Sequence, residues 1–162
     1  MDRCLVCDFP ETNDLSAILD RIENTGGGDL IVNLACDFAE RAINNHPEPA
    51  QAQEWLKAAR GRRTDPEATK EAVHDVWIKA DGSDGHEASW AVWYAVTSAE
   101  WQAEWRAGAR AMKAAERAMV ATGSPVAERE WQLEHTRKLA CTCLVLESGP
   151  LGSRSRNSLL AH

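Results

Sequence analysis

The fold is decided by residues 90–120, which read WAVWYAVTSAEWQAEWRAGARAMKAAERAMV. An alanine stands at every fourth position of this stretch, and residues four apart form a ridge on the surface of a helix. Because a ridge of methyl groups lets a second helix approach closely, the stretch predicts a tightly packed helix at the centre of the domain. The ridge consists of Ala91, Ala95, Ala99, Ala103, Ala107, Ala111 and Ala115.

A second set of residues in the same stretch recurs at steps of three and four, as the apolar face of an amphipathic helix does. This face holds Tyr94, Thr97, Trp101, Trp105, Gly108, Met112, Ala115 and Met119. One helix over the whole stretch would be about 48 Å long, which is long for a single domain of this size. Residues 97–100, TSAE, have the form of a capping box, so we expect two helices that meet near Thr97.

Helical patterns separated by proline and glycine account for most of the remaining chain. We expect helices over residues 14–23, 30–45, 50–60 and 64–79, another that begins at residue 84, and a last one that starts near residue 125 and ends at residue 146. Asp29 is expected to cap the second helix, and Trp131, Leu139 and Leu146 are expected to face inward from the last one. No segment alternates as a strand does. The predicted fold is therefore all-α, a single-domain bundle of six or seven helices with short loops.

The composition suggests three regions along the chain. Residues 1–13 form an N-terminal extension that contains two cysteines, and residues 14–147 form the helical domain. Residues 148–162 are rich in Ser, Arg and Gly, which predicts a flexible tail. Residues 149–153 of this tail, GPLGS, resemble a cleavage-site remnant from expression vectors, so a vector origin is an open alternative.

Charge and cysteine content limit the functions that fit. The formal net charge is −7 and the pI is about 5.2, which argues against nucleic acid as the main partner because phosphate binding needs clustered Lys and Arg. Such a charge suits a basic protein partner, or serves solubility alone. No apolar run approaches the roughly 20 residues of a membrane span. Five cysteines without a secretory signal predict reduced thiols and a cytoplasmic location.

Four of the cysteines are the best candidates for a metal site. Cys4 and Cys7 have the spacing of a zinc half-site, whereas Cys141 and Cys143 are closer together than is usual. If the two ends of the chain meet, these four thiolates would suit one tetrahedral zinc ion, and a disulfide between the ends is an alternative. Cysteines on helices are also often plain small apolar residues, which is what we expect of Cys36. Zinc is the one cofactor that the sequence suggests.

The chain lacks the short motifs of nucleotide-binding and hydrolytic enzymes. Its histidines at positions 46, 74, 86 and 135 do not have metal-ligand spacing. Asp37 with Glu40, and His74 with Asp75, would build a site only if the fold brought other polar groups to them. The sequence therefore assigns no catalytic residue.

A partner-binding site is predicted within residues 90–120. Glu100 and Glu104 are four residues apart and would share a helix face beside Trp101 and Trp105. Aromatic anchors with a charged rim are typical of binding hot spots. The alternative is that these tryptophans lie in the core while the acids face water.

Three segments resemble a known protein family. They are LACDFAERA at residues 34–42, AARG at 58–61 and EWQLEH at 130–135. With the alanine-rich stretch between them, their order resembles that of the Imm-five-like immunity proteins of bacteria over about residues 30–145. This chain differs from the family pattern in its extra tryptophans and its N-terminal cysteine pair. The resemblance implies a small cytoplasmic protein that neutralises a partner by binding it, in a toxin–antitoxin or phage-conflict system.

Three functional hypotheses follow from the sequence. The first is a non-enzymatic inhibitor, an immunity or anti-defence protein, which covers the surface of a basic toxin, nuclease or defence protein. The second is a helical-bundle enzyme or sensor with a metal or small-molecule site lined by Trp90, Trp93, Tyr94 and His135. The third is a structural oligomer, such as a homodimer, in which the alanine ridge packs between subunits.

Overall fold

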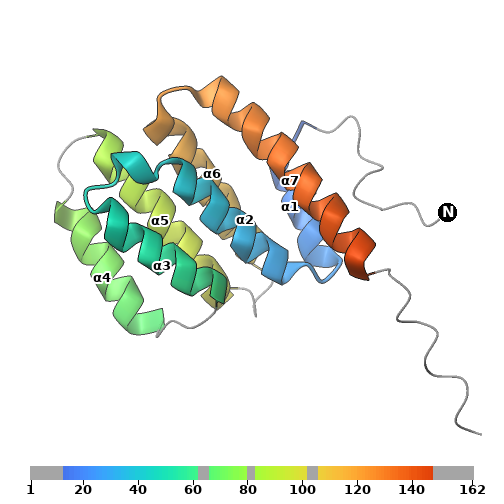
Figure 1. Cartoon of the computed structure of the whole chain (residues 1–162), viewed down its shortest axis with the longest axis horizontal. Helices are drawn as coiled ribbons and strands as arrows, with labels where there is room; N and C mark the ends of the chain where they lie inside the picture. Colours follow the sequence, from blue (N-terminus) through green and yellow to red (C-terminus); the bar gives the residue numbers. More distant parts are fainter. Residues whose placement is uncertain (1–12, 62–65, 80–82, 102–105, 148–162) are drawn as a thin grey trace, which may run out of the picture.

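The computed structural model describes residues 13–61, 66–79, 83–101 and 106–147 (Figure 1). These described residues are 89% helical and form seven α-helices, which confirms the predicted all-α, single-domain bundle. In the described ranges, none of the helices has the length and apolarity needed to cross a membrane. The predicted extension and tail lie outside these ranges, except for Asn13.

The helices follow one another through short connections. Their bounds are α1 Leu15–Asn24, α2 Gly28–Arg41, the 3-10 helix η1 Ile43–Asn45, α3 Pro49–Gly61, α4 Pro66–Lys79, α5 Ser83–Trp101, α6 Ala107–Thr122 and α7 Pro125–Glu147. Three helices begin at a proline, whose fixed φ and missing N–H suit the first helical position. The first helix is capped by Asp14, whose carboxylate accepts a hydrogen bond from the Ser16 N–H at 3.0 Å.

The predicted break at Thr97 is wrong. Helix α5 continues through this residue to Trp101, and α6 begins at Ala107, so the interruption falls later in the stretch. The buried Thr97 hydroxyl donates to the Trp93 carbonyl at 2.9 Å, and the Ser98 hydroxyl donates to the Ala95 carbonyl at 2.6 Å. Thr and Ser hydroxyls can satisfy themselves inside a helix in this way, so a capping-box sequence does not require a helix end.

The connection between α1 and α2 also differs from the prediction, because Asp29 lies inside the first turn of α2 and does not cap it. The cap position belongs to Gly27, whose N–H donates to the Ile22 carbonyl at 2.9 Å. A Cβ atom at Gly27 would lie 2.6 Å from Ile22 Cγ2, and Gly26 has a φ of +86°. Glycine at both positions lets the chain turn back tightly against α1.

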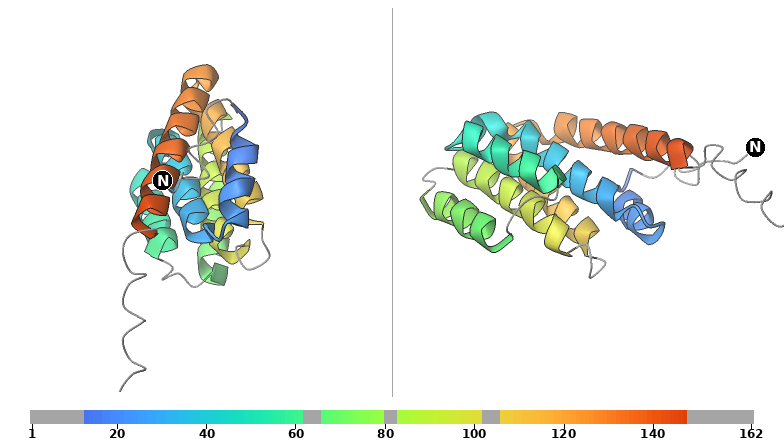
Figure 2. Two further views of the ribbon diagram at one scale, coloured as in Figure 1. Left: turned by 90° about the vertical axis from the view of Figure 1, so that its right-hand side faces the viewer. Right: turned by 60° about the horizontal axis from the view of Figure 1, so that its bottom comes forward.

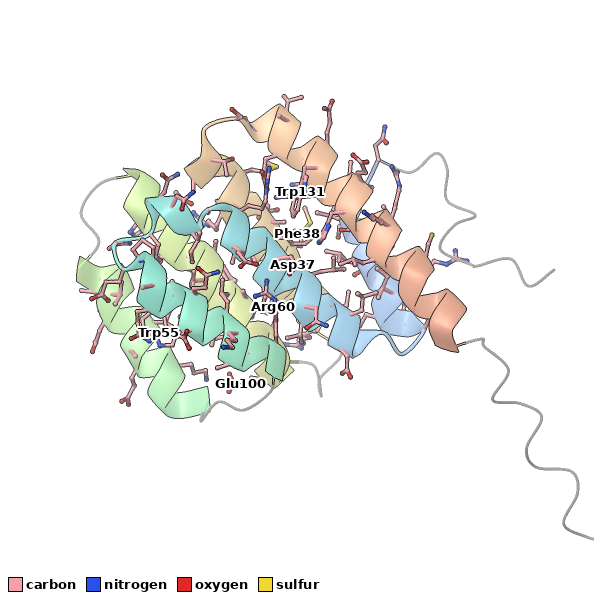
Figure 3. All side chains as sticks on the ribbon, viewed as in Figure 1. Asp37, Phe38, Trp55, Arg60, Glu100 and Trp131 are labelled. Carbon is pink, nitrogen blue, oxygen red and sulfur yellow. The ribbon has the colours of Figure 1, made fainter. Side chains whose placement is uncertain are left out.

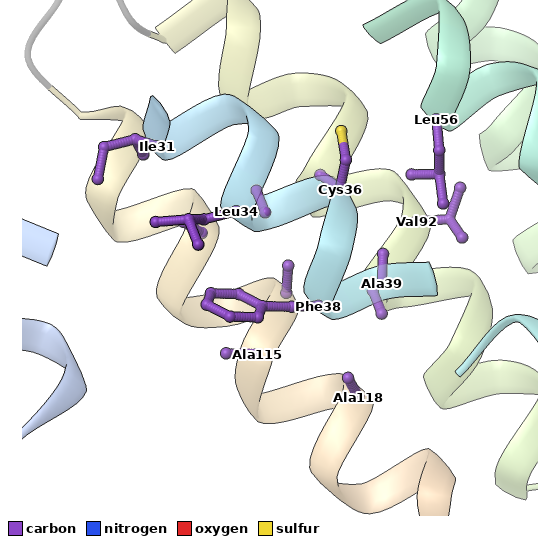
Figure 4. Close-up of a cluster of buried hydrophobic side chains, with 14 of the residues drawn as sticks. Ile31, Leu34, Cys36, Phe38, Ala39, Leu56, Val92, Ala115 and Ala118 are labelled. Carbon is purple, nitrogen blue, oxygen red and sulfur yellow. The ribbon is translucent and has the colours of Figure 1, made fainter. Parts of the chain in front are cut away.

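Helix α2 supplies the centre of the core. It crosses in front of α5 and α6 in Figure 1, and it packs against both. Figure 4 shows the Phe38 ring next to Ala115 of α6, with Ala118 further along the same helix, while Leu56 of α3 lies beside Val92 of α5. All five of these side chains are fully buried. Small residues on α6 thus make room for the large side chains of α2.

Five of the seven alanines of the ridge are buried inside the monomer, as the pattern predicts for a helix contact. Ala91 and Ala95 of α5 and Ala107, Ala111 and Ala115 of α6 are all 0% exposed, and α5 packs against α6. Ala99 is half-exposed and Ala103 lies outside the described residues, so a homodimer stays a prediction. The second predicted stripe is buried only in part, since Tyr94, Met112 and Met119 are half-exposed.

Helix α7 lies along the outside of the bundle in both views of Figure 2. Its inward face is largely polar, with Glu128, Gln132 and Thr136 all buried. Gln132 donates from Nε2 to the Ala115 carbonyl at 3.0 Å, so hydrogen bonds help to dock the helix on α6. Trp131 and Leu139, both predicted to face inward, are only half-buried, and the side chain of Leu146 is outside the description.

A buried carboxylate joins α1 to α6. Glu23, at the end of α1, accepts hydrogen bonds from the N–H groups of Ala107 at 2.8 Å and Gly108 at 3.1 Å. These are the first two residues of α6, whose N–H groups have no partner within the helix. Glu23 is 7% exposed, so this interaction is shielded from water. It fixes the start of α6 against α1.

His46 predicts a pH-dependent contribution to stability. The imidazole is buried, and its Nδ1 accepts a hydrogen bond from the Glu48 N–H at 2.9 Å just before α3. Burial lowers the pKa of His46 below its ordinary value. Because the unfolded chain then binds a proton more readily than the folded one, the stability from neutral His46 is complete above about pH 6.5 and is lost as the pH falls below it.

Urea unfolding of the wild type and of His46→Gln, at about pH 7 and about pH 5, tests this expectation. The wild type should lose more unfolding free energy between the two pH values than the variant does. Equal losses in the two proteins would show that His46 does not contribute to the pH dependence.

Candidate functional site

A surface pocket of about 380 Å³ lies where η1 and one side of α2 meet α7, and we call it the α2–α7 pocket. Its lining residues are Asp37, Glu40, Arg41, Asn44, Trp131 and His135. The first four follow one another at spacings of three, one and three residues, which places them along one side of the chain. Phe38, between them in sequence, is fully buried on the core side. The pocket therefore presents the polar face of the helix whose apolar face forms the core.

An arginine from α3 holds the two carboxylates of the pocket in place. Arg60 Nη2 lies 2.6 Å from Asp37 Oδ1 and 2.6 Å from Glu40 Oε2. Figure 3 shows Asp37 and Arg60 close together, below Trp131 in the view. Burial alone would lower the pKa of Arg60, but the hydrogen bonds with Asp37 and Glu40 raise it above its ordinary value. The guanidinium is therefore a permanent positive charge behind the pocket.

Helix α7 contributes a stacked pair of rings. The His135 and Trp131 ring centroids are 4.6 Å apart, with an interplanar angle of 13°. His135 Nε2 also lies 2.8 Å from Asp37 Oδ2, so Asp37 has one oxygen at Arg60 and the other at His135. The carboxylate thus sets the orientation of the imidazole, and the imidazole in turn supports the indole ring.

Arg41 covers Trp131 from α2. Its Cζ atom is 4.3 Å from the centroid of the indole ring, a distance typical of a cation–π interaction. Its Nε lies 3.2 Å from Oε2 of Glu128, whose side chain is only 3% exposed, whereas that of Arg41 is 44% exposed. A buried carboxylate therefore anchors a largely exposed guanidinium over a half-buried aromatic ring.

The groups of the pocket that could take part in covalent chemistry are the Asp37 and Glu40 carboxylates and the His135 imidazole. The thiol nearest in sequence, Cys36, is buried, and burial raises its pKa to about 12, so it is not a ready nucleophile. Among the residues that the structure describes, no three His, Cys, Asp or Glu side chains are grouped to hold a metal ion. What the pocket offers is a rigid set of charges and aromatic rings.

The predicted partner-binding residues remain untested. Glu100, on the last turn of α5, forms an ion pair with Lys70 of α4 at 2.8 Å. Trp101 ends α5, but its side chain is outside the description, as are Glu104 and Trp105 altogether.

The structure describes two of the five cysteines well enough to compare them with the predictions. Cys36 is a free, buried cysteine, as predicted. Cys141 takes part in a disulfide bond, so the reduced state predicted for all five cysteines does not hold for it. Its bonding partner, Cys4, Cys7 and the side chain of Cys143 are outside the description. A link between the two ends of the chain, by zinc or by disulfide, stays a prediction.

The second hypothetical site is divided between two clusters. His135 belongs to the α2–α7 pocket, whereas Trp90, Trp93 and Tyr94 form their own group on α5, with Arg110 and Arg117 of α6 over their rings. The predicted four-residue lining therefore does not form as a unit.

The three segments that carry the family resemblance meet at the α2–α7 pocket. Asp37 comes from the first, Arg60 from the second, and Trp131 and His135 from the third. Sequence reasoning noted Asp37 and Glu40 but did not connect them with Arg60 or His135. The sequence did contain one local signal of this site. Asp37, Glu40 and Arg41 are spaced so that they lie on one side of α2, opposite its buried apolar side.

No protein-family model, no curated protein and no solved structure matches this chain. The structure therefore defines only a structural class, an all-α bundle with a charged and aromatic surface pocket.

Proposed function

We propose that this protein is a non-enzymatic inhibitor that binds a partner protein at the α2–α7 pocket and covers the partner's working surface. The observation that carries the proposal is the half-exposed Trp131, held between Arg41 and His135 by ion pairs to Glu128 and Asp37. Tryptophan and arginine are the residues most enriched in binding hot spots. Side chains already fixed in place lose little entropy when a partner binds.

Charge and resemblance indicate the kind of partner. The net charge of −7 favours association with a basic protein, such as a nuclease toxin or a defence nuclease, because opposite charges speed encounter. The resemblance to Imm-five-like immunity proteins supports the same class of partner, and the proposed setting is the cytoplasm. An anti-defence role against a bacterial nuclease is the close variant of this proposal.

Substituting Asn44 tests the proposal without disturbing the network of ion pairs. Asn44 is exposed and lines the pocket, so Asn44→Arg should fill the entrance with a bulky cation. We expect this variant to bind the protein that co-purifies from the native host at least about tenfold more weakly than the wild type, as measured by calorimetry. A cation there should also repel a basic partner.

Asn24→Arg is the matched control, because Asn24 is an exposed asparagine at the end of α1, away from the pocket lining. It should change the affinity by less than about twofold. Both variants should keep the melting temperature of the wild type. Unchanged binding of Asn44→Arg, or failure to isolate any partner, would count against the proposal.

The pocket also favours a second candidate function, a sensor or enzyme for a small molecule. Its volume of about 380 Å³ falls within the range of small-ligand sites, and Asp37 orients His135 as a general base requires. In this case His135→Gln should abolish ligand-induced stabilisation in thermal melts while inhibition of a protein partner persists. Loss of inhibition in His135→Gln, with no small molecule stabilising the wild type, supports the inhibitor instead.

A further inference from the structure

A second surface pocket lies at the turn between α6 and α7, and we call it the α6–α7 pocket. Its volume is about 540 Å³, within the range of small-ligand sites. Gly123, at a φ of +71°, lets the chain reverse there, and α7 begins at Pro125. The described residues that line this pocket include none that lines the α2–α7 pocket, so a ligand bound here is independent of the proposed function.

The walls of the α6–α7 pocket are mostly aliphatic. The apolar lining residues are Met119, Pro125, Val126 and Leu133. Their side chains offer no strong hydrogen-bonding group, and Val126 is 73% exposed to water. The exposed Asn13 and Glu130 complete the lining together with Arg129. A ligand that fits these walls therefore has an apolar body, since removing apolar surface from water on both sides is favourable.

Arg129 is the cation of this pocket, and its contacts are with sulfur. Its Nε donates to Met119 Sδ at 3.1 Å, and its Nη1 lies 3.9 Å from Met112 Sδ. Thioethers are weak acceptors. Within the described residues, Arg129 has neither an ion pair with a carboxylate nor an acceptor for Nη2. Burial also lowers the pKa of Arg129 below its ordinary value. The protein itself therefore compensates this half-buried charge poorly.

Two carboxylates act on Arg129 from a distance, and each has a partner of its own. Glu116 binds Lys113 Nζ at 3.2 Å, and Asp14 caps α1. With Glu130 at the pocket, they disfavour a ligand that carries two negative charges, such as a phosphate monoester. A single carboxylate in direct contact with the guanidinium gains short, charge-assisted hydrogen bonds, which outweigh the screened repulsion between separated charges.

We propose that the α6–α7 pocket binds a small monocarboxylic acid with an aliphatic chain. The carboxylate accepts hydrogen bonds from Arg129, because a planar guanidinium matches a carboxylate through two parallel N–H···O contacts. The chain lies against Met119 and Leu133, where each buried methylene adds to the affinity. Such a ligand supplies the strong acceptor that the two thioethers do not provide.

Isothermal titration calorimetry of the full-length protein with octanoate provides the test. We expect saturable binding at one site, with a Kd below about 1 mM. Octanol has the same chain length without the charge, and acetate has the charge without the chain, so each should bind at least about tenfold more weakly. Octyl phosphate should bind no more tightly than octanoate, because its second charge meets the carboxylates around Arg129.

Two substitutions locate the site. Arg129→Gln removes the charge and should weaken octanoate binding at least about tenfold, whereas Lys57→Gln removes a charge from an exposed position on α3 and should leave the affinity within about twofold. Val126→Asp places a carboxylate at the pocket and should weaken binding by about tenfold. Its matched control is Val120→Asp, at an exposed valine outside the lining, which should stay within about twofold.

His135→Gln, in the α2–α7 pocket, should bind octanoate like the wild type. Melting temperatures without ligand identify any variant that fails to fold, and if Arg129→Gln unfolds, the pair Val126→Asp and Val120→Asp decides the result. The inference is overturned if octanoate does not saturate, if octanol binds as tightly, or if octyl phosphate binds more tightly. It is also overturned if either folded pocket variant binds octanoate like the wild type, or if His135→Gln abolishes binding.

Discussion

Replacing Glu23 with alanine is expected to lower the free energy of unfolding by about 3 kcal/mol. The Glu23 carboxylate accepts hydrogen bonds from the Ala107 and Gly108 N–H groups, and it is 7% exposed. Its loss leaves two donors at the start of α6 without an acceptor in a place that water reaches poorly. Chemical denaturation followed by circular dichroism measures the effect, and a loss below about 1 kcal/mol would contradict the role of Glu23 as the cap of α6.

Two further variants make this prediction specific. Glu54→Gln removes a carboxylate from an exposed position on α3 and should change stability by less than about 0.5 kcal/mol. Gly108→Ala should destabilise the protein, although alanine favours helices over glycine by about 1 kcal/mol. A Cβ atom at Gly108 would lie 2.7 Å from Glu23 Oε2, so the carboxylate would have to move. A more stable Gly108→Ala protein would show that the carboxylate is not held there.

Replacing Phe38 with alanine is expected to lower the free energy of unfolding by about 4 kcal/mol. The ring is fully buried and lies next to Ala115, as Figure 4 shows, and Ala118 further along α6 is fully buried too. Because alanine has no rotamers, these neighbours cannot move side-chain atoms into the space that the ring leaves. Urea denaturation at constant pH provides the measurement.

Phe38→Leu keeps most of the apolar volume and should cost less than half as much as Phe38→Ala. Val126→Ala, at a position that is 73% exposed, should change stability by less than about 0.5 kcal/mol. If Phe38→Ala cost no more than Val126→Ala, α2 would not be the centre of the core.

The helices could be predicted from the sequence because their signals are local. Apolar residues at steps of three and four, Asp14 before the first helix and Pro125 at the start of the last each act within a few residues. The capping box at Thr97 failed for a related reason, since the same hydroxyl can bond to a carbonyl inside a helix where the residue is buried. A local sequence pattern is compatible with more than one helix boundary, and the packing of the helices decides which boundary forms.

The orientation of α7 and the pocket could not be predicted in the same way. Apolar spacing places Trp131 inward, whereas the buried residues of α7 include Glu128, Gln132 and Thr136 beside Leu133 and Ala140. The polar groups of the first three find partners across helices or within α7. Asp37 and His135 are 98 residues apart in sequence. No spacing rule connects such residues, and only the packing of α7 against α2 brings them together.

Oxidative footprinting of the tryptophans tests the central claim, that a partner protein covers the α2–α7 pocket. Trp131 is half-exposed in the free protein, and Trp55 of α3, also half-exposed and in contact with His46, serves as the internal reference. In the complex with the partner from the native host, Trp131 should become several-fold less reactive while Trp55 keeps its reactivity. The account would be contradicted if the partner is inhibited in the complex while Trp131 oxidises as fast as it does in the free protein.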